Sequence, residues 1–335
     1  MKELKALPRA AAPGSRPMTL YRLRCFEVTF EEGGFKRATA RLHVTQPALS
    51  YQIKQLEADL GVQLFSRRPG GISPTEAGEL LFRHVRRISA LVRQARDAVK
   101  ELAEGPAGEI RIGTVNSVGV YFLPRLLWAV RSRHPAARPT VLYRDAEGIL
   151  DALLASRLDL AILADPRLDH RLRYETLFEE RVSLVCGRSH PFRALPRVHP
   201  EDLARVAFVA LSSSTPTGAL AAAHLARLGV AVDPVVSSED VETVKRMVAL
   251  GMGVAFLPDM VTENETVSDE NPGARLARIP LQPVLTRRVV LVTWSGSQPS
   301  RAVMAFIDEL RRWSGERRGD PPAVSPPPHG AGGAS

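Results

Sequence analysis

The sequence lacks several features that would point to a function directly. Its 335 residues contain no run of eighteen apolar residues, which argues against a transmembrane helix and a membrane partner. The two cysteines, Cys25 and Cys186, are far apart and have no zinc-binding spacing, so they predict neither a disulfide nor a metal site. We expect both to be small buried hydrophobic side chains in a protein of the reducing cytoplasm.

Catalytic motifs are also missing. No G-x-S-x-G, H-E-x-x-H or P-loop pattern occurs. The run GMGVAF, residues 251–256, lacks the third glycine of a dinucleotide fingerprint and precedes a strand-like segment, whereas the fingerprint should follow one. The eight histidines are scattered along the chain. We therefore expect no catalytic residue, no metal, no cofactor and no enzyme activity.

Positive charge is concentrated in the N-terminal third. Residues 1–104 hold 18 Lys and Arg against 11 Asp and Glu, whereas the rest of the chain holds 27 against 25. This distribution is expected when only the N-terminal third contacts phosphates of a nucleic acid. An arginine-rich composition throughout would explain the net charge of +9 but explains its distribution less well.

The segment HVTQPALSYQIKQLEADLG, residues 43–61, predicts a helix with two different faces. Thr45 is placed to cap its start, Pro47 falls in the first turn, and Gly61 is placed to end it. Apolar residues at intervals of four, three and four form one face, namely Leu49, Ile53, Leu56 and Leu60. The opposite face carries short-range hydrogen-bonding groups with a single charge, namely Gln46, Pro47, Ser50, Tyr51 and Lys54.

The flanking segments complete a predicted winged helix-turn-helix. Helices over residues 20–32 and 35–42 precede this helix, and residues 62–65 and 72–74 are predicted to pair as a short hairpin. Their expected core side chains are Leu20, Leu23, Phe26, Phe30, Phe35, Ala38 and Leu42. Uncharged polar groups suit base edges, and basic groups suit phosphates. The predicted DNA-binding residues are Lys36, Arg37, Thr45, Gln46, Pro47, Ser50, Tyr51, Lys54, Arg67 and Arg68.

A long helix over residues 77–104 follows, and its apolar residues repeat with heptad spacing over three repeats. The predicted dimerisation residues are Leu81, Val85, Ile88, Val92, Ala95, Val99 and Leu102. The alternative is a helix that packs only on its own domain. The sequence GPAG, residues 105–108, is predicted to end the helix and to form a hinge.

The N-terminal motifs resemble those of LysR-type transcriptional regulators. The order Phe-x-x-Ala, Gln-Pro-Ala-Leu-Ser, Ile-x-x-Leu-Glu, Leu-Gly-x-x-Leu-Phe and Thr-x-x-Gly matches over about sixty positions. The resemblance implies that the long helix dimerises and links a DNA-binding domain to a sensor domain. Tyr51 stands where arginine is frequent and Thr39 where alanine is usual, so the resemblance does not specify the operator sequence.

The C-terminal part alternates strand-like and helix-like segments, which predicts α/β architecture with parallel strands. We expect two subdomains, one formed by residues 109–168 and 271–315 and the other by residues 169–270. The segments LDLAI and MVALGMGVAFLP extend the resemblance to LysR-type regulators, and their style is shared with periplasmic solute-binding proteins.

Polar residues that follow two predicted strands suggest an effector site. In open α/β sheets ligands bind beyond the carboxyl ends of strands, near helix starts. The candidate effector-binding residues are Asn116, Ser117, Ser213, Ser214 and Thr215. Hydroxyl and N–H groups there suit a small carboxylate or phosphate ester, and the resemblance implies that positions near Ser117 and Thr215 line the cleft. The alternative is that these residues are only helix caps. Arg144 is either a counter-charge or a surface arginine.

Together these patterns predict an α+β multidomain protein. It comprises a disordered extension (1–17), a winged helix-turn-helix (18–76), a linker and dimerisation helix (77–104), a two-subdomain α/β effector domain similar to periplasmic binding proteins, and a Pro/Gly-rich disordered tail (316–335). The expected partners are a double-stranded DNA operator, a small and anionic effector, a second copy of the chain in a homodimer or homotetramer, and RNA polymerase if the protein is an activator. The alternative is a small-molecule carrier or enzyme with a basic helical head.

Overall fold

The computed structural model describes residues 18–318 except 69–70, 105–107, 196–197, 264–274 and 280–282. The predicted extension, most of the predicted tail and most of the predicted hinge lie outside these residues. The chain divides into two compact units, Met1–Ala95 and Arg96–Ser335. In the part of the chain that is described, no helix is long and apolar enough to span a membrane.

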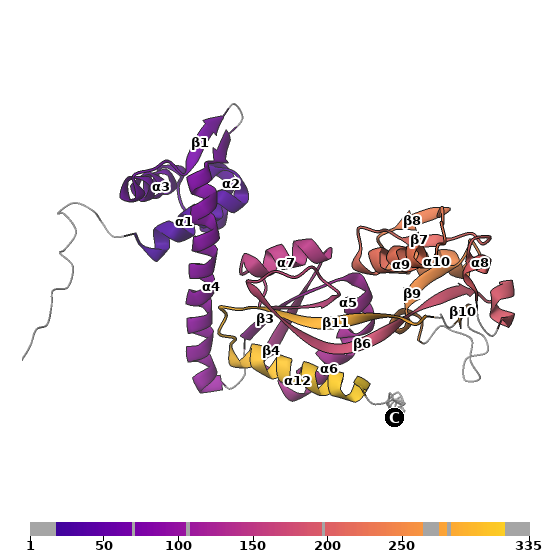
Figure 1. Ribbon diagram of the computed structural model, residues 1–335. Helices are drawn as coiled ribbons and strands as arrows, with labels where there is room; N and C mark the ends of the chain where they lie inside the picture. Colours follow the sequence, from indigo (N-terminus) through magenta and orange to yellow (C-terminus); the bar gives the residue numbers. More distant parts are fainter. Residues whose placement is uncertain are drawn as a thin grey trace, which may run out of the picture. The chain divides into compact units, whose positions relative to one another are not determined.

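The first unit is a winged helix-turn-helix, as predicted (Figure 1). Its elements are α1 (Leu20–Glu32), α2 (Phe35–Leu42), α3 (Gln46–Leu60), the antiparallel pair β1 (Phe65–Arg68) and β2 (Gly71–Pro74), and the start of α4 (Glu76–Glu104). The Thr45 hydroxyl accepts a hydrogen bond from the Ala48 N–H and so caps α3. Gly61 ends α3 with φ of 69°, a left-handed conformation that glycine adopts without strain.

The core of this unit contains the predicted apolar face of α3, with two exceptions at helix ends. Leu49, Ile53 and Leu56 are buried, whereas Leu60 in the last turn is 38% exposed and Leu20 in the first turn of α1 is 56% exposed. The prediction that Leu20 belongs to the core is therefore wrong, and Leu60, although on the apolar face of α3, is not part of the core.

Helix α4 changes its environment along its length. Val85 is completely buried in the winged-helix core, and Leu81 and Ile88 pack against that core. Val85 therefore has no surface left for a second copy, and here the alternative of packing within the domain applies. Further along the helix Ala95 is exposed and Val99 is 68% exposed, while the side chain of Leu102 lies outside the described residues.

The second unit is built on one mixed sheet. Its strands are β3 (Gly108–Thr114), β4 (Ala137–Tyr143), β5 (Leu160–Ala164), β6 (Leu172–Gly187), β9 (Ala255–Pro258), β10 (Leu276–Ile279) and β11 (Leu285–Trp294). The order is β10-β6-β11-β5-β3-β4, with β9 also paired to β6. Strands β3, β4 and β5 are parallel, as predicted, and the others pair antiparallel.

The long strand β6 was only partly predicted. The run RVSLVCG, residues 181–187, has the apolar pattern of a strand, but the strand starts at Leu172 and its first part pairs with β11. Charged residues in this first part obscure the apolar pattern. The predicted limits of the two subdomains remain a prediction, because β6 and β11 run through the whole sheet and Asn271 lies outside the described residues.

Helices cover both faces of this sheet. The helices of this unit are α5 (Asn116–Tyr121), α6 (Leu123–Arg133), α7 (Ala146–Leu154), α8 (Pro200–Leu203), α9 (Pro216–Arg227), α10 (Val241–Ala249), α11 (Asp259–Thr262) and α12 (Arg301–Arg318). A 3₁₀ turn lies at Pro191–Ala194, and β7 (Val209–Leu211) and β8 (Val236–Ser238) form a separate parallel pair. In Figure 1, α6 and α12 lie on one side of the strands and α7 on the other. The predicted tail starts too early, because α12 continues to Arg318.

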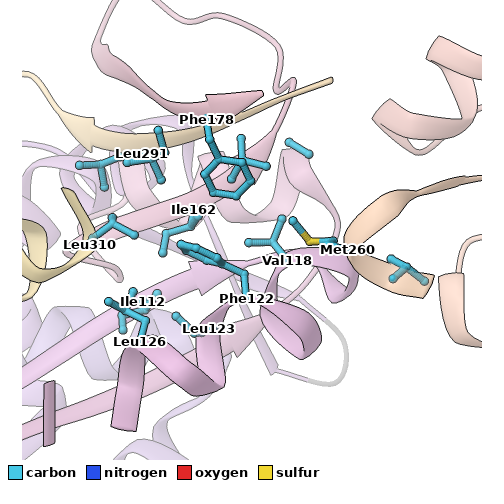
Figure 2. Close-up of a cluster of buried hydrophobic side chains, with 14 of the residues drawn as sticks. Ile112, Val118, Phe122, Leu123, Leu126, Ile162, Phe178, Met260, Leu291 and Leu310 are labelled. Atoms are coloured by element: carbon cyan, nitrogen blue, oxygen red, sulfur yellow. The ribbon is translucent and has the colours of Figure 1, made fainter. Parts of the chain in front are cut away.

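The main core lies between the sheet and these helices. Figure 2 shows Phe122, at the corner between α5 and α6, among Val118, Ile162 and Phe178. The rings of Phe122 and Phe178 are 5.2 Å apart and tilted by 50°. Along β5 the side chains alternate, so that Ile162 faces this cluster while Leu163 faces the cluster that contains α7.

Both cysteines are free and buried, as the sequence predicted. Burial raises the pKa of the Cys186 thiol to about 11. Since the thiolate is the reactive form, this thiol is inert at neutral pH.

We expect the stability of the second unit to fall in mild acid through His224. This side chain of α9 is 1% exposed, and its Nε2 has no hydrogen-bond partner in the described part of the chain. Burial lowers the pKa of His224, and the charge of Arg227 lowers it further. The unfolded chain takes up a proton at His224 near pH 6.5, whereas the folded chain does so only at a lower pH. Protonation therefore favours the unfolded state, and stability is lost as the pH falls below about 6.5.

The test is the thermal unfolding midpoint between pH 7.5 and pH 5.5. His224→Phe keeps the ring beside Phe256 but takes up no proton, so its midpoint should fall less steeply with acid than that of the wild type. His170→Asn, at an exposed position, is the matched control and should follow the wild type. Equal slopes for all three proteins would contradict the assignment to His224.

Candidate functional site

The outward face of α3 carries the residues predicted to contact DNA. Gln46, Pro47 and Lys54 are exposed, Tyr51 is 49% exposed and Ser50 is half-buried. They lie opposite the buried Leu49, Ile53 and Leu56. The helix therefore presents hydrogen-bonding groups on its outward face, of which only Lys54 is charged among those named, and such an arrangement suits base edges in a major groove.

Basic side chains lie on the neighbouring elements. Lys36 and Arg37 are exposed on α2, and Arg68 is exposed on β1. The Arg37 guanidinium donates to the backbone oxygen of Glu32, which ties α2 to the end of α1. The side chain of Arg67 lies outside the described residues. Exposed cations at these positions suit phosphate contacts.

A cleft of about 390 Å³ opens in the second unit. It is lined by Val115, Asn116, Ser117, Tyr143, Arg144, Asp145, Ala146, Ala164, Leu211, Ser214, Thr215, Pro216, Thr217, Glu239, Asp240, Val241, Pro258 and Arg287. Four of the predicted effector-binding residues are among these, and Ser213 is not. Arg144 lines the cleft too, which favours its interpretation as a counter-charge.

Arg287, which the sequence analysis missed, lies at the base of this cleft and is 2% exposed. Its Nε donates to Glu180 Oε1 at 2.7 Å, and Nη2 lies 2.6 Å from the same oxygen. Its Nη1 donates to Ser117 Oγ at 3.1 Å and to Thr217 Oγ1 at 2.8 Å. One buried cation thus joins β6, β11 and the starts of α5 and α9.

The two threonines at the start of α9 differ in what their hydroxyls do. The Thr215 hydroxyl donates to the Ser212 oxygen at 2.8 Å and accepts from the Gly218 N–H at 3.1 Å, so it is occupied in capping the helix. The Thr217 hydroxyl is buried and accepts from Arg287. Thr215 therefore caps α9, which is the alternative that the sequence left open, and its place among the effector-binding residues stays a prediction.

Acidic groups occupy two other helix starts at the cleft. Asp145 precedes α7, and Asp240 caps α10 by accepting from the N–H and hydroxyl of Thr243 at 3.1 and 2.7 Å. Asp240 also accepts from the Asn116 side chain at 3.1 Å, which is a direct contact between the two walls. Burial raises the pKa of Asp240, but the hydrogen bonds from Thr243 and Asn116 outweigh burial and hold that pKa below its usual value.

A second polar contact joins the same helices outside the cleft. Lys245 of α10 is 4% exposed, donates to the Tyr121 hydroxyl of α5 at 2.5 Å and lies 3.1 Å from Glu242. The α5 and α10 walls therefore meet at both Asn116 and Tyr121. In the described residues no group of three or more His, Cys, Asp or Glu side chains is arranged to hold a metal ion.

Two family models match the chain. Residues 20–79 match the model described as "Bacterial regulatory helix-turn-helix protein, lysR family", and residues 103–315 match "LysR substrate binding domain". A protein of Porphyra purpurea named probable RuBisCO transcriptional regulator is 32% identical over 247 residues, which cover 72% of this chain and 78% of that protein. A protein of Phaeodactylum tricornutum with the same name is 28% identical over 306 residues, covering 90% and 98%.

Solved structures show the same fold. A full-length OxyR variant from Pseudomonas aeruginosa superposes with a TM-score of 0.71 at 25% identity, covering 88% of this chain and 95% of that one. The structure of CbnR, described as a LysR family transcriptional regulator, gives 0.64 at 22% identity and covers 89% and 99%. At that identity the second likeness concerns the fold alone.

We expect the buried pair of Arg287 and Glu180 to be required for folding of the second unit. Arg287→Met leaves the Glu180 carboxylate buried without its cation and should cost about 3–5 kcal/mol of unfolding free energy. Adding Glu180→Gln removes the uncompensated charge and should restore most of this loss. Chemical denaturation followed by circular dichroism measures both effects.

The matched control is the exposed pair of Arg311 and Glu175, whose side chains are 49% and 43% exposed. Arg311→Met should cost less than about 1 kcal/mol, since exposed pairs are screened by water. If Arg287→Met were no more destabilising than Arg311→Met, the central role of the buried pair would be wrong.

Proposed function

The chain belongs to the LysR family of DNA-binding transcriptional regulators, and from this premise we propose that a small anionic effector, bound in the cleft of the second unit, controls how the protein acts on its operator. Members of this family are transcription factors, so the chain is a regulator and not an enzyme. The alternative of a carrier or enzyme with a basic head does not account for the match over residues 20–79.

The proposed DNA contacts divide by chemistry. Gln46, Ser50 and Tyr51 of α3 read base edges, whereas Lys54 and Arg68 bind phosphates. The support is their arrangement. Uncharged polar groups and Lys54 lie on the outward face of α3, and Arg68 lies on the wing. A homodimer or homotetramer would place two such helices on successive major grooves, and the exposed Val99 side of α4 is the proposed contact. We also propose that the protein acts in the cytoplasm and that it contacts RNA polymerase if it is an activator.

The observation that carries the effector proposal is the double donation by Arg287. When Nη1 donates to Ser117 Oγ and Thr217 Oγ1, it occupies an acceptor site on each hydroxyl, so each hydroxyl proton is left to donate elsewhere. Both residues line the cleft. A carboxylate or phosphate oxygen between them would receive two donors polarised by one cation.

For DNA, Ser50→Ala should weaken binding to a specific operator by about 1–3 kcal/mol and leave binding to a scrambled duplex nearly unchanged. Lys54→Ala is the matched control on the same face and should weaken both by similar factors, with a reduced dependence on salt. Gel-shift titrations on the two duplexes measure this. Equal losses for Ser50→Ala on both would exclude base reading by Ser50.

For the effector, thermal shift with a panel of small organic acids and sugar phosphates should identify an anion that stabilises the wild type. Thr217→Val removes the hydroxyl without changing the shape of the side chain, and should weaken binding of the hit about tenfold, the value of one charged hydrogen bond. Thr217→Ser retains the hydroxyl and should bind like the wild type.

Titration calorimetry on the three proteins gives the dissociation constants. Thr215→Ser, which keeps the cap of α9, is a second control and should also bind like the wild type. A hit that binds Thr217→Val and wild type equally would remove Thr217 from the site. A panel without any hit would contradict the anionic class.

A further inference from the structure

We infer that the effector is a dipolar molecule of the α-amino acid class, with its carboxylate at Ser117, Thr217 and Arg287 and its ammonium group at Asp240 and Glu239. The inference rests on the proposed function, since it assumes that the cleft binds the effector. It names the chemistry of that molecule from the two unlike ends of the cleft.

The proposed carboxylate end of the cleft lies at Arg287 and the two hydroxyls that it contacts. Its positive charge is compensated by Glu180, through Nε and Nη2 on the side away from the hydroxyls. Two hydroxyls that line the cleft accept from Nη1, one from α5 and one from α9, and each keeps its proton for a ligand. Two donors without a full free charge suit one carboxylate better than a doubly charged phosphate.

The opposite end is acidic and has no cation of its own. Glu239 is exposed, lines the cleft and accepts the Ser214 hydroxyl at 2.7 Å. Asp240 lines the cleft beside it. In the described ranges neither carboxylate forms an ion pair with a Lys or Arg side chain. Asp240 accepts its hydrogen bonds from Thr243 and Asn116, which are neutral groups. An ammonium group would supply the missing positive charge.

The balance of charge in the lining leads to the same conclusion. Three carboxylates face the cleft, at Asp145, Glu239 and Asp240, against two guanidinium groups, at Arg144 and Arg287. Since Arg287 is already paired with Glu180, the lining carries an excess of negative charge. An ammonium group beside the anionic group of the ligand would offset this excess.

The two ends of the cleft meet at the start of α5. Asn116 and Ser117 are consecutive residues, yet Asn116 bonds to Asp240 and Ser117 bonds to Arg287. Their Cα atoms are about 3.8 Å apart, as in any trans peptide. One helix start therefore contacts both the acidic end and the hydroxyl end of the cleft, through two adjacent residues.

The rest of the cleft is suited to a side chain. Val115, Leu211, Val241 and Pro258 provide apolar surface, and Tyr143 adds an aromatic ring. The volume of about 390 Å³ lies at the lower end of the range of small-molecule sites, and it leaves room beyond the two charged groups. The cleft is therefore expected to prefer an apolar or aromatic amino acid over a small polar one.

The experiment uses the full-length protein and the standard L-amino acids as probes in a thermal shift screen. Each hit is compared by calorimetry with the acid that lacks its amino group and with the amine that lacks its carboxylate. The amino acid should bind at least about tenfold more tightly than either, because each truncated probe loses one set of charged hydrogen bonds.

Two variants test the ammonium end. Asp240→Asn removes the charge but keeps an acceptor for the cap of α10. Glu239→Gln removes the charge at an exposed position and keeps an acceptor for the Ser214 hydroxyl. Either should weaken the amino acid about tenfold and leave the matched acid unaffected or bound more tightly. Asp233→Asn, at an exposed position outside the lining, is the control for net charge and should change neither.

The outcomes separate this inference from the proposed function. If the acid binds as tightly as the amino acid, or if acids bind and no amino acid does, the dipolar class is overturned while an anionic effector in the cleft stands. If both charge variants weaken acid and amino acid equally, the assignment of the ammonium end is overturned. If no amino acid, acid or sugar phosphate binds, both proposals fail.

Discussion

The cleft depends on one buried ion pair. Removing Arg287 and Glu180 from water is expensive, and the cost is offset by their mutual attraction and by the hydrogen bonds that each makes to its neighbours. Glu180 holds Arg287 from β6 and also accepts the Met260 N–H at 3.3 Å, while Nη1 holds the starts of α5 and α9. The walls of the cleft are therefore positioned around a fixed cation, and the two long strands provide the rigid support for it.

Local signals made the winged helix-turn-helix predictable. Thr45, Pro47 and Gly61 act within a few residues of their own positions, and the apolar spacing of α3 decides its buried face regardless of the rest of the chain. Leu20 and Leu60 are less predictable because exposure at a helix end depends on how far the neighbouring helix extends. Burial of Val85 in the core of its own unit likewise depends on tertiary packing, which heptad spacing does not encode.

The cleft was less predictable, because its chemistry is assembled from distant residues. Ser117 and the start of α9 were found from the strand-to-helix pattern, but which hydroxyl is free depends on backbone bonds that the sequence does not show. Arg287 did leave a signal, since it alternates with Leu285 and Val289 on the buried face of β11. An arginine at such a position requires a buried partner, but Glu180 lies far away in the sequence.

The contacts between the walls limit how strongly a ligand can act. The α5 side bonds to α10 through Asn116 and Asp240 and through Tyr121 and Lys245, and it is joined to α9 through Arg287. A ligand shifts the arrangement only by the difference between the bonds that it makes and those that it replaces. Because the bonds replaced are of the same kind, this difference is expected to be about 1–3 kcal/mol, typical of allosteric coupling. Because the walls of this cleft are bonded to each other, a ligand has only this difference in free energy with which to shift their arrangement.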